Sequence, residues 1–218
     1  MKKRIEAEST EALFSTVYAN KIWGGDARTA FYSGAGSHDP ALVDPYVRGV
    51  TRFVAGLPGR RDAVDLGCGD FNVGSRLRQL FDGYVACDVV PALIERNRNA
   101  YSDLNVEFRC IDIARDDLPD GDIVFIRQVL QHLGNDDIRS VLAKLQKYEF
   151  LVLTEHLPKS ADFPQNVDQV TGAGTRLIAG SGVVVTAAPF ALEHKAQQTL
   201  LDVHGYGGVI RTTVYQLA

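Results

Sequence analysis

The sequence predicts a doubly wound α/β fold, with a sheet of about seven strands and helices on both faces. Apolar runs of strand length alternate with amphipathic stretches between residues 62 and 157. Alternation of this kind is typical of parallel strands joined by helices. A second observation is the glycine-rich turn that directly follows the first apolar run. A third is a pair of apolar runs on either side of a glycine-rich turn near residue 206, which indicates a closing antiparallel hairpin.

Two helices are expected before the first strand. Residues 9–23 place their apolar side chains on one face, and Ser9 is a suitable N-cap. Residues 24–40 are rich in glycine, alanine and serine without an apolar period, so we expect a loop. Asp39 can cap the next helix, with Pro40 in its first turn, and that helix runs to about residue 57.

Five strands and the helices between them are expected next. The strands are predicted at residues 62–66, 84–89, 105–113, 121–128 and 148–156. The helices are predicted at residues 72–81, 91–101, 129–133 and 138–146. Pro91 opens the second of these helices, and either Asn135 or Asp136 is expected to cap the last.

The whole chain is expected to form one domain. Its 218 residues, 45% of them hydrophobic, are enough for a full core. We divide it into N-terminal helices with a loop, a cofactor-binding core, an insertion on the substrate side, and a C-terminal hairpin, at residues 1–60, 61–157, 158–198 and 199–218. The insertion shows mixed strand and loop signals and no clear helix.

Composition disfavours several classes of protein. The net charge of −4 gives no basic face for nucleic acid, and no apolar run approaches the ~18 residues of a membrane helix. No apolar stretch follows the first basic residues, so we expect no secretory signal. The chain has three cysteines, Cys68, Cys87 and Cys110, and so small a number is typical of a protein in the reducing cytoplasm. Their side chains either fill small spaces in the apolar core or lie close together around a ligand. The sequence has no H-x-x-x-H or C-x-x-C pattern of metal ligands, so we expect no metal site.

The glycine turn AVDLGCGDFNVG discriminates between two classes of cofactor. A dinucleotide-binding turn has three glycines in the pattern G-x-G-x-x-G, but here Gly74 comes two positions late. Carboxylates at Asp65 and Asp70 would repel a pyrophosphate and favour a ligand with cationic groups. Asp88 ends the second strand 21 residues after Gly67, the position that accepts hydrogen bonds from ribose hydroxyls. Asp112, at the end of the third strand, adds an acceptor for an adenine amino group.

Four motifs together resemble those of the class I S-adenosylmethionine-dependent methyltransferases. They are VDLGCGDF, ACDVV, CIDIARDDLP and DIVFIRQVLQHL, and the closing hairpin is similar to the family's last two strands. The resemblance implies a Rossmann-like sheet and S-adenosylmethionine as cofactor. It implies that Asp65 and Gly67 hold the methionine portion, that Gly69 allows close approach, and that Asp88 binds the ribose. It also implies that Val89 packs on adenine.

The resemblance extends to other residues of the predicted site. Asp112 and Ile113 would contact the adenine edge, and Arg127 would lie near the methionine carboxylate or the substrate. The N-terminal loop resembles a WG…SGxGS segment of a bacterial methyltransferase subgroup. Two interpretations of this loop are open. Its backbone amides would bind the cofactor carboxylate or an anionic group of the substrate, or the loop is only a flexible connector. The full set of predicted cofactor-binding residues is Trp23, Ser33, Gly36, Ser37, Asp65, Gly67, Cys68, Gly69, Asp88, Val89, Asp112, Ile113, Arg127 and Gln128.

Three residues are candidates for a catalytic base, if methyl transfer uses one. His132 follows the fourth strand and serves either catalysis or packing. Glu155 and His156 end the fifth strand, and because neighbours on a strand point to opposite faces, only one of them can face the ligand. Asp168 and His194 lie in irregular sequence and are weaker candidates.

The predicted partner is a small-molecule acceptor, methylated on oxygen or nitrogen; a sugar or natural-product metabolite fits. Nucleic acid and membrane are not expected as partners, and a monomer and a homodimer are equally compatible. Three other functions stay open. They are methylation of protein or nucleic acid, a dinucleotide-dependent oxidoreductase, and a cofactor-binding partner protein without activity.

Overall fold

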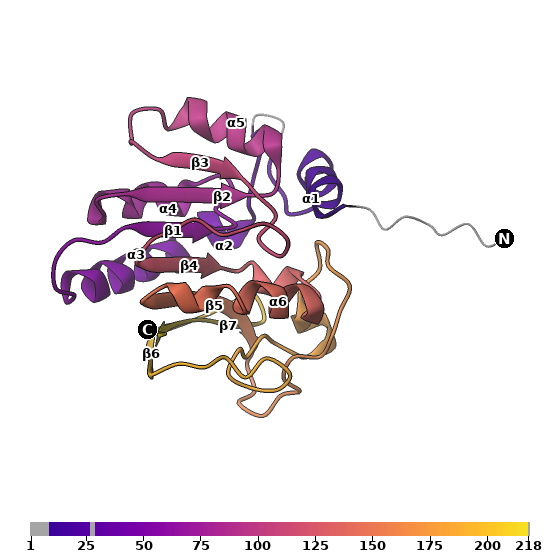
Figure 1. Ribbon diagram of the computed structural model, residues 1–218. Coiled ribbons are helices and arrows are strands. Elements are labelled where there is room, and N and C mark those ends of the chain that lie inside the picture. The colour runs from indigo at the N-terminus through magenta and orange to yellow at the C-terminus, as the bar shows by residue number, and fades with distance from the viewer. Residues whose placement is uncertain (1–8, 27–28, 218) are drawn as a thin grey trace.

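The predicted alternation forms a seven-stranded mixed sheet with strand order β3-β2-β1-β4-β5-β7-β6 (Figure 1). This is a computed structural model, and it describes residues 9–26 and 29–217. The strands are β1 Ala63–Leu66, β2 Tyr84–Asp88, β3 Glu107–Cys110, β4 Ile123–Arg127, β5 Phe150–Pro158, β6 Ala196–Gly205 and β7 Gly208–Gln216. The first five strands pair in parallel, and β7 runs antiparallel to β5 and β6. The predicted fold class is therefore confirmed.

Five of the six α-helices in the described residues lie near their predicted positions with altered bounds, and α2 was not predicted. The helix expected at residues 129–133 is instead the short 3-10 helix Leu130–His132. The α-helices are α1 Thr10–Ala19, α2 Ala35–His38, α3 Pro40–Ala55, α4 Asn72–Leu77, α5 Pro91–Ala100 and α6 Asn135–Leu142. Ser9 Oγ accepts a hydrogen bond from the Ala12 amide at 3.1 Å, and Asp39 accepts one from Ala41 at 2.9 Å. Both predicted N-caps are thus confirmed. In the described part of the chain, no helix is both long and apolar enough to cross a membrane.

Alternating strand residues build two apolar clusters, one on each face of the sheet. On β1 and β4, Val64 and Ile126 belong to the cluster that also contains α6, while Ala63 and Phe125 belong to the cluster of α3 and α4. Strand side chains alternate between faces, so a sheet buried on both faces must be apolar at nearly every position. The helices consequently cover both faces, as expected.

Two loops differ from the prediction. The segment 24–40 is not loop throughout, because residues 35–38 form the single turn α2 against α3 and α4. Positions 27–28 of that segment lie outside the described residues. The third strand ends at Cys110 rather than at residue 113. Beyond it, the Ile111 amide still bonds to the Asp88 carbonyl at 3.0 Å, and Asp112 then starts a turn whose carbonyl accepts from Arg115 and Asp116.

The predicted caps of α6 are wrong. Neither Asn135 nor Asp136 caps the helix, since both lie inside its first turn and Gly134 occupies the N-cap position. The capping groups come from the insertion instead. Asp168 Oδ1 accepts from the Asn135 amide at 2.8 Å, and Thr171 Oγ1 accepts from the Gly134 amide at 2.9 Å. Long-range partners satisfy the orphan amides of this helix, so no local cap is needed.

Candidate functional site

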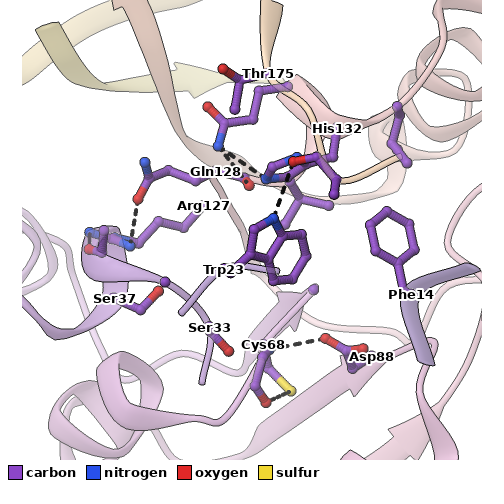
Figure 2. Close-up of a pocket in the computed structure, with 18 of the residues that line it drawn as sticks. Phe14, Trp23, Ser33, Ser37, Cys68, Asp88, Arg127, Gln128, His132 and Thr175 are labelled. Atoms are coloured by element: carbon purple, nitrogen blue, oxygen red, sulfur yellow. Dashed lines mark hydrogen bonds between the residues drawn. The ribbon is translucent and has the colours of Figure 1, made fainter. Parts of the chain in front are cut away.

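A large pocket lies at the carboxyl ends of the parallel strands, where Phe14 and Tyr18 of α1 also line it (Figure 2). Its cavity volume is about 340 Å³. Strand β1 is flanked by β2 on one side and β4 on the other, which makes this edge the switch point of the sheet. Ligands of open α/β sheets bind in that crevice. In Figure 2, Asp88 and Cys68 form one wall, His132 and Gln128 form another, and Trp23 lies between them.

The glycine turn forms the floor of the pocket. Gly67 has φ +78°, and a Cβ atom there would lie 2.4 Å from Val129 Cγ2. Gly69 has φ +56°, and its Cβ atom would lie 2.4 Å from Ser33 Oγ. Side chains are excluded from both positions by conformation and by space. The bare backbone therefore reaches the pocket, as the glycine spacing predicts.

Asp88 places a buried carboxylate in the wall of the pocket next to this turn. Its Oδ2 atom accepts from the Gly69 amide at 3.0 Å, and its Oδ1 atom accepts from Val90 at 3.2 Å. Burial raises the pKa of this carboxyl to about 6, against the effect of the surrounding backbone amides of Gly69, Val89 and Val90. The carboxylate is therefore fixed in orientation and retains free lone pairs for a ligand.

Asp65 lies elsewhere, because its side chain is on the other side of the glycine turn. It lines a second cavity of about 30 Å³ together with Tyr46, Tyr84 and Arg127, and it is absent from the lining of the large pocket. The Tyr84 hydroxyl donates to Asp65 Oδ2 at 3.1 Å. Burial raises the pKa of Asp65 to about 7. A direct contact with the methionine portion stays a prediction, and the observed geometry suits support of the turn from behind.

The ends of β2 and β3 form the far wall. Val89, Ile111, Asp112 and Ile113 all line the pocket. Asp112 also holds its own loop, since it accepts from the Ala114 amide at 2.9 Å and from Arg115 at 2.7 Å. The wall thus combines apolar side chains with one carboxylate, which suits a flat heterocycle with an amino group.

The serine–glycine segment, residues 33–37, covers the glycine turn. Ser33 and Asp70 bond reciprocally, with Asp70 donating its amide to Ser33 Oγ at 2.8 Å and accepting from the Ser33 amide at 3.1 Å. His38 lies 2.5 Å from the same Asp70 carboxylate. Farther along, Arg127 donates to the Gly36 carbonyl at 2.6 Å. The segment is therefore docked on the site, and this geometry disfavours a simple connector.

Trp23 and Arg127 both line the pocket. The Trp23 ring nitrogen donates to the Ala173 carbonyl at 3.1 Å, which joins the N-terminal segment to the insertion. Arg127 also donates to Gln128 Oε1 at 3.1 Å and lies over the Tyr46 ring. Its Nε atom has no hydrogen-bond partner within the described part of the chain. Such a partly buried cation suits an anionic group on a ligand.

The two strand-five candidates point to opposite faces, as predicted. His156 lines the large pocket, whereas Glu155 does not. His156 Nε2 lies 3.2 Å from the Gly205 carbonyl, and burial lowers the pKa of its imidazole. Glu155 is buried on the other face, where burial raises its pKa to about 8. Of the two, only His156 is placed to touch a ligand.

His132 lines the pocket and is held on three sides. Its ring packs against Trp23 with the centroids 5.0 Å apart. Its Nδ1 atom lies 3.0 Å from the Gly174 carbonyl, and its Nε2 atom lies 3.2 Å from the Gln131 amide nitrogen. Burial lowers the pKa of the imidazole to about 4. The ring is therefore neutral at pH 7 and tightly packed.

The weaker candidates and two of the cysteines lie outside the pocket. Asp168 caps α6, and His194 packs edge-on against Tyr215. Cys68 lines the pocket, but Cys87 is buried in the core and Cys110 is exposed. All the other predicted cofactor residues line the large pocket, with Asp65 as the exception.

Sequence reasoning missed several lining residues. Thr175 and Ala173 come from the insertion, Tyr206 and Ile210 from the hairpin, and Gln131 from the turn after β4. The insertion and hairpin residues reach the site only through folding of distant segments. Gln131 had a local signal, because it directly precedes the candidate His132.

Comparison with known proteins agrees with this geometry. Residues 64–148 match a family model described as a methyltransferase domain. The match covers the glycine turn, Asp88, Asp112 and the turn after β4. A search of curated proteins found no match to this chain.

Solved structures share the fold over nearly the whole chain. An N-methyltransferase, NodS from Bradyrhizobium japonicum WM9, in complex with S-adenosyl-L-homocysteine, has a TM-score of 0.65 at 12% identity, with 97% of this chain and 100% of that chain covered. The N-terminal domain of EvdMO1, in the presence of S-adenosylhomocysteine and D-fucose, has a TM-score of 0.60 at 15% identity over 97% and 100%. A complex of DhpI with S-adenosylhomocysteine has a TM-score of 0.51 at 20% identity over 84% and 91%. These likenesses establish the Rossmann-like methyltransferase fold.

Proposed function

We propose that this protein is an S-adenosylmethionine-dependent methyltransferase that methylates an oxygen or nitrogen atom of a small molecule. One observation carries the proposal: a pocket at the switch point of the sheet places the bare glycine turn beside the buried carboxylate of Asp88. The methyltransferase-domain match over residues 64–148 supports it. Solved structures of the same fold that contain S-adenosylhomocysteine support it as well.

The strand order suggests how the cofactor lies. Adenine would lie against the ends of β2 and β3, at Val89 and Ile111–Ile113, with Asp112 at its amino group. The ribose hydroxyls would donate to Asp88. The methionine portion would then cross β1 towards β4, where the unpartnered Arg127 Nε suits its carboxylate. The walls beyond β4, at His156, Thr175, Tyr206 and Ile210, are left for the acceptor.

The residues of the site would then act by binding and orientation. The bound cofactor supplies an electrophilic methyl group to a lone pair on the acceptor. In-line alignment of the two reactants accounts for most of the rate acceleration such a site can give. The pocket walls exclude water from the reacting centre, and His156 is placed to take the acceptor's proton where the acceptor is a hydroxyl.

The composition of the pocket favours a small acceptor. Its walls are mostly apolar, with a few polar groups, which is typical of small-molecule sites. A sugar or another natural-product metabolite fits this description. A protein or nucleic-acid acceptor is the second candidate and would call for an open, basic channel, which the net charge of −4 disfavours.

Thermal shift with three ligands tests the cofactor. We expect S-adenosylmethionine and S-adenosylhomocysteine to stabilise the protein and NAD to have no effect. A ligand at ~100 Kd stabilises by about 2.7 kcal/mol, which for a domain of this size raises Tm by roughly 5–10 °C. Stabilisation by NAD alone would identify a dinucleotide enzyme.

Transfer of a radiolabelled methyl group tests the activity. The protein is incubated with labelled S-adenosylmethionine and a fractionated metabolite extract, and label is expected in a small-molecule fraction. Label in protein or RNA would support the second candidate. Cofactor binding without transfer to any fraction would instead indicate an inactive partner protein.

The Ser33→Ala variant tests the role of the serine–glycine segment. The hydroxyl accepts from the Asp70 amide and pairs with the Tyr18 hydroxyl at 3.0 Å, so its loss loosens the cover over the cofactor. We expect S-adenosylhomocysteine to bind about 3–10-fold more weakly, mainly through faster dissociation, measured by stopped-flow fluorescence of Trp23. Ser140→Ala on α6 is the control. An unchanged dissociation rate in Ser33→Ala would show that this segment does not help to retain the cofactor.

The pH profile tests His156 as the base. Because a carbonyl only accepts hydrogen bonds, the contact with Gly205 places the proton on Nε2 and leaves the lone pair on Nδ1. A base must be neutral to act, and burial lowers the pKa of this imidazole below its ordinary value of about 6.5. We therefore expect kcat/KM for the acceptor, measured at saturating S-adenosylmethionine so that titration of Asp88 does not limit it, to be constant near pH 7 and to fall at a pH below about 6.5. His156→Gln should lose this acidic limb, whereas the exposed His204→Gln should keep it.

A further inference from the structure

Gln131 is a pocket residue whose position neither the cofactor nor the base explains. It lies in the one-turn 3-10 helix Leu130–His132 directly after β4 and is 5% exposed. Its backbone carbonyl accepts from Gln169 of the insertion at 2.7 Å. It lines the same pocket as Ala173 and Thr175 of the insertion.

The hydrogen bonds of His132 determine which way the Gln131 amide is oriented. The Gly174 carbonyl only accepts, so the neutral His132 ring carries its proton on Nδ1 and presents a lone pair on Nε2. That lone pair accepts from Gln131 Nε2 at 3.2 Å. The second hydrogen on the same nitrogen points to the Gln128 carbonyl at 3.3 Å. A flipped amide would set its oxygen against two acceptors, so the orientation is fixed.

The amide oxygen of Gln131 is consequently the side-chain atom that still lacks a hydrogen-bond partner. Gln131 Oε1 is buried and has no hydrogen-bond partner among the residues that the structure describes. Buried acceptors without a donor are costly and are uncommon away from functional sites. Since the nitrogen is fully used, any group that satisfies this side chain must donate a hydrogen bond.

We propose that Gln131 Oε1 accepts a hydrogen bond from a hydroxyl or N–H group of the methyl acceptor and so determines acceptor specificity. The inference rests on the proposed function, because it assigns the acceptor half of the same pocket. His132 then acts as a positioning residue that orients the Gln131 amide. The acceptor class is a small molecule that carries a hydrogen-bond donor, and analogues capped at that donor are rejected.

Binding of matched probe pairs to the protein saturated with S-adenosylhomocysteine tests this. The pairs are cyclohexanol, benzyl alcohol and phenol, each against its methyl ether, followed by ligand-observed NMR. The wild type is expected to bind the hydroxyl member of at least one pair tenfold or more tightly than the ether. Gln131→Leu should lose that preference and bind the ether as the wild type does. Gln146→Leu, a glutamine outside the pocket, should behave like the wild type.

Each other result overturns the proposal. Equal affinity for alcohol and ether in the wild type, or no binding of any probe, would show that the oxygen does not select donors. A Gln131→Leu variant that keeps the preference would do the same. Weaker binding of S-adenosylhomocysteine in Gln131→Leu would place the residue on the cofactor. Failure of the wild type to bind S-adenosylhomocysteine, measured before any probe is added, is a failure of the proposed function and is thus distinguishable.

Discussion

Replacing Asp88 with asparagine is expected to weaken the binding of S-adenosylhomocysteine by about 100-fold or more. The carboxylate is held by the Gly69 and Val90 amides and lines the pocket where the ribose would lie. Each charge-assisted hydrogen bond to a ribose hydroxyl contributes about 1.5–3 kcal/mol, and asparagine removes the charge from both. The amide nitrogen would also face one of the two backbone donors. Isothermal titration calorimetry measures the change in Kd.

Two matched acids serve as controls for this result. Asp112→Asn should weaken binding less, about tenfold or below, because Asp112 already bonds to Ala114 and Arg115. Asp82→Asn, at an exposed ion pair just before β2 and outside the pocket lining, should leave Kd unchanged. Binding by Asp88→Asn at the wild-type affinity would refute the assignment of the ribose to the end of β2.

Replacing Arg176 with methionine is expected to lower the free energy of unfolding by about 3–4 kcal/mol. The side chain is 2% exposed and joins the insertion to the turn after β4. It donates to three carbonyls and to Asn135 Oδ1, and methionine would remove all four of these hydrogen bonds. Of the four acceptors, the Leu130 carbonyl would keep its bond from the Leu133 amide. A decrease in Tm of roughly 10 °C follows for a domain of this size, measured by calorimetry.

Arg139→Met on α6 is the control for that variant. Its guanidinium is half exposed and pairs with Asp136 on the same helix, so its loss should change stability by less than about 1 kcal/mol. Equal Tm values for the two variants would mean that the Arg176 contacts contribute nothing. The pocket walls proposed for the methyl acceptor depend on these Arg176 hydrogen bonds, because the carbonyls of Leu130 and Leu133 flank Gln131 and His132.

The sheet could be predicted from the sequence because its signals are local. Four of the five parallel strands are apolar runs that are largely buried, whereas the edge strand β3 exposes three of its four residues. The acids at Asp65, Asp88 and Asp112 lie at or near the ends of the first three runs. The glycine turn was predictable for the same reason, since φ and close approach at Gly67 and Gly69 exclude any other residue.

The rest of the site depends on contacts between distant segments. Asp168 caps a helix 33 residues earlier, and Trp23 meets Ala173 across 150 residues. No periodicity encodes such pairs. The amide orientation of Gln131 likewise follows from the Gly174 carbonyl, which acts through His132. The sequence therefore indicates an irregular insertion on the substrate side but not which of its residues, Ala173 and Thr175, line the pocket.

A crystal structure with bound S-adenosylhomocysteine tests whether this pocket holds the cofactor. We expect density for the ligand at the carboxyl ends of β1 to β4, with both ribose hydroxyls within hydrogen-bond distance of the Asp88 carboxylate. We also expect the sulfur atom on the β4 side of the glycine turn, facing the walls formed by His156 and Gln131. A ligand whose ribose lies away from Asp88, or an empty pocket at saturating ligand, would contradict this prediction.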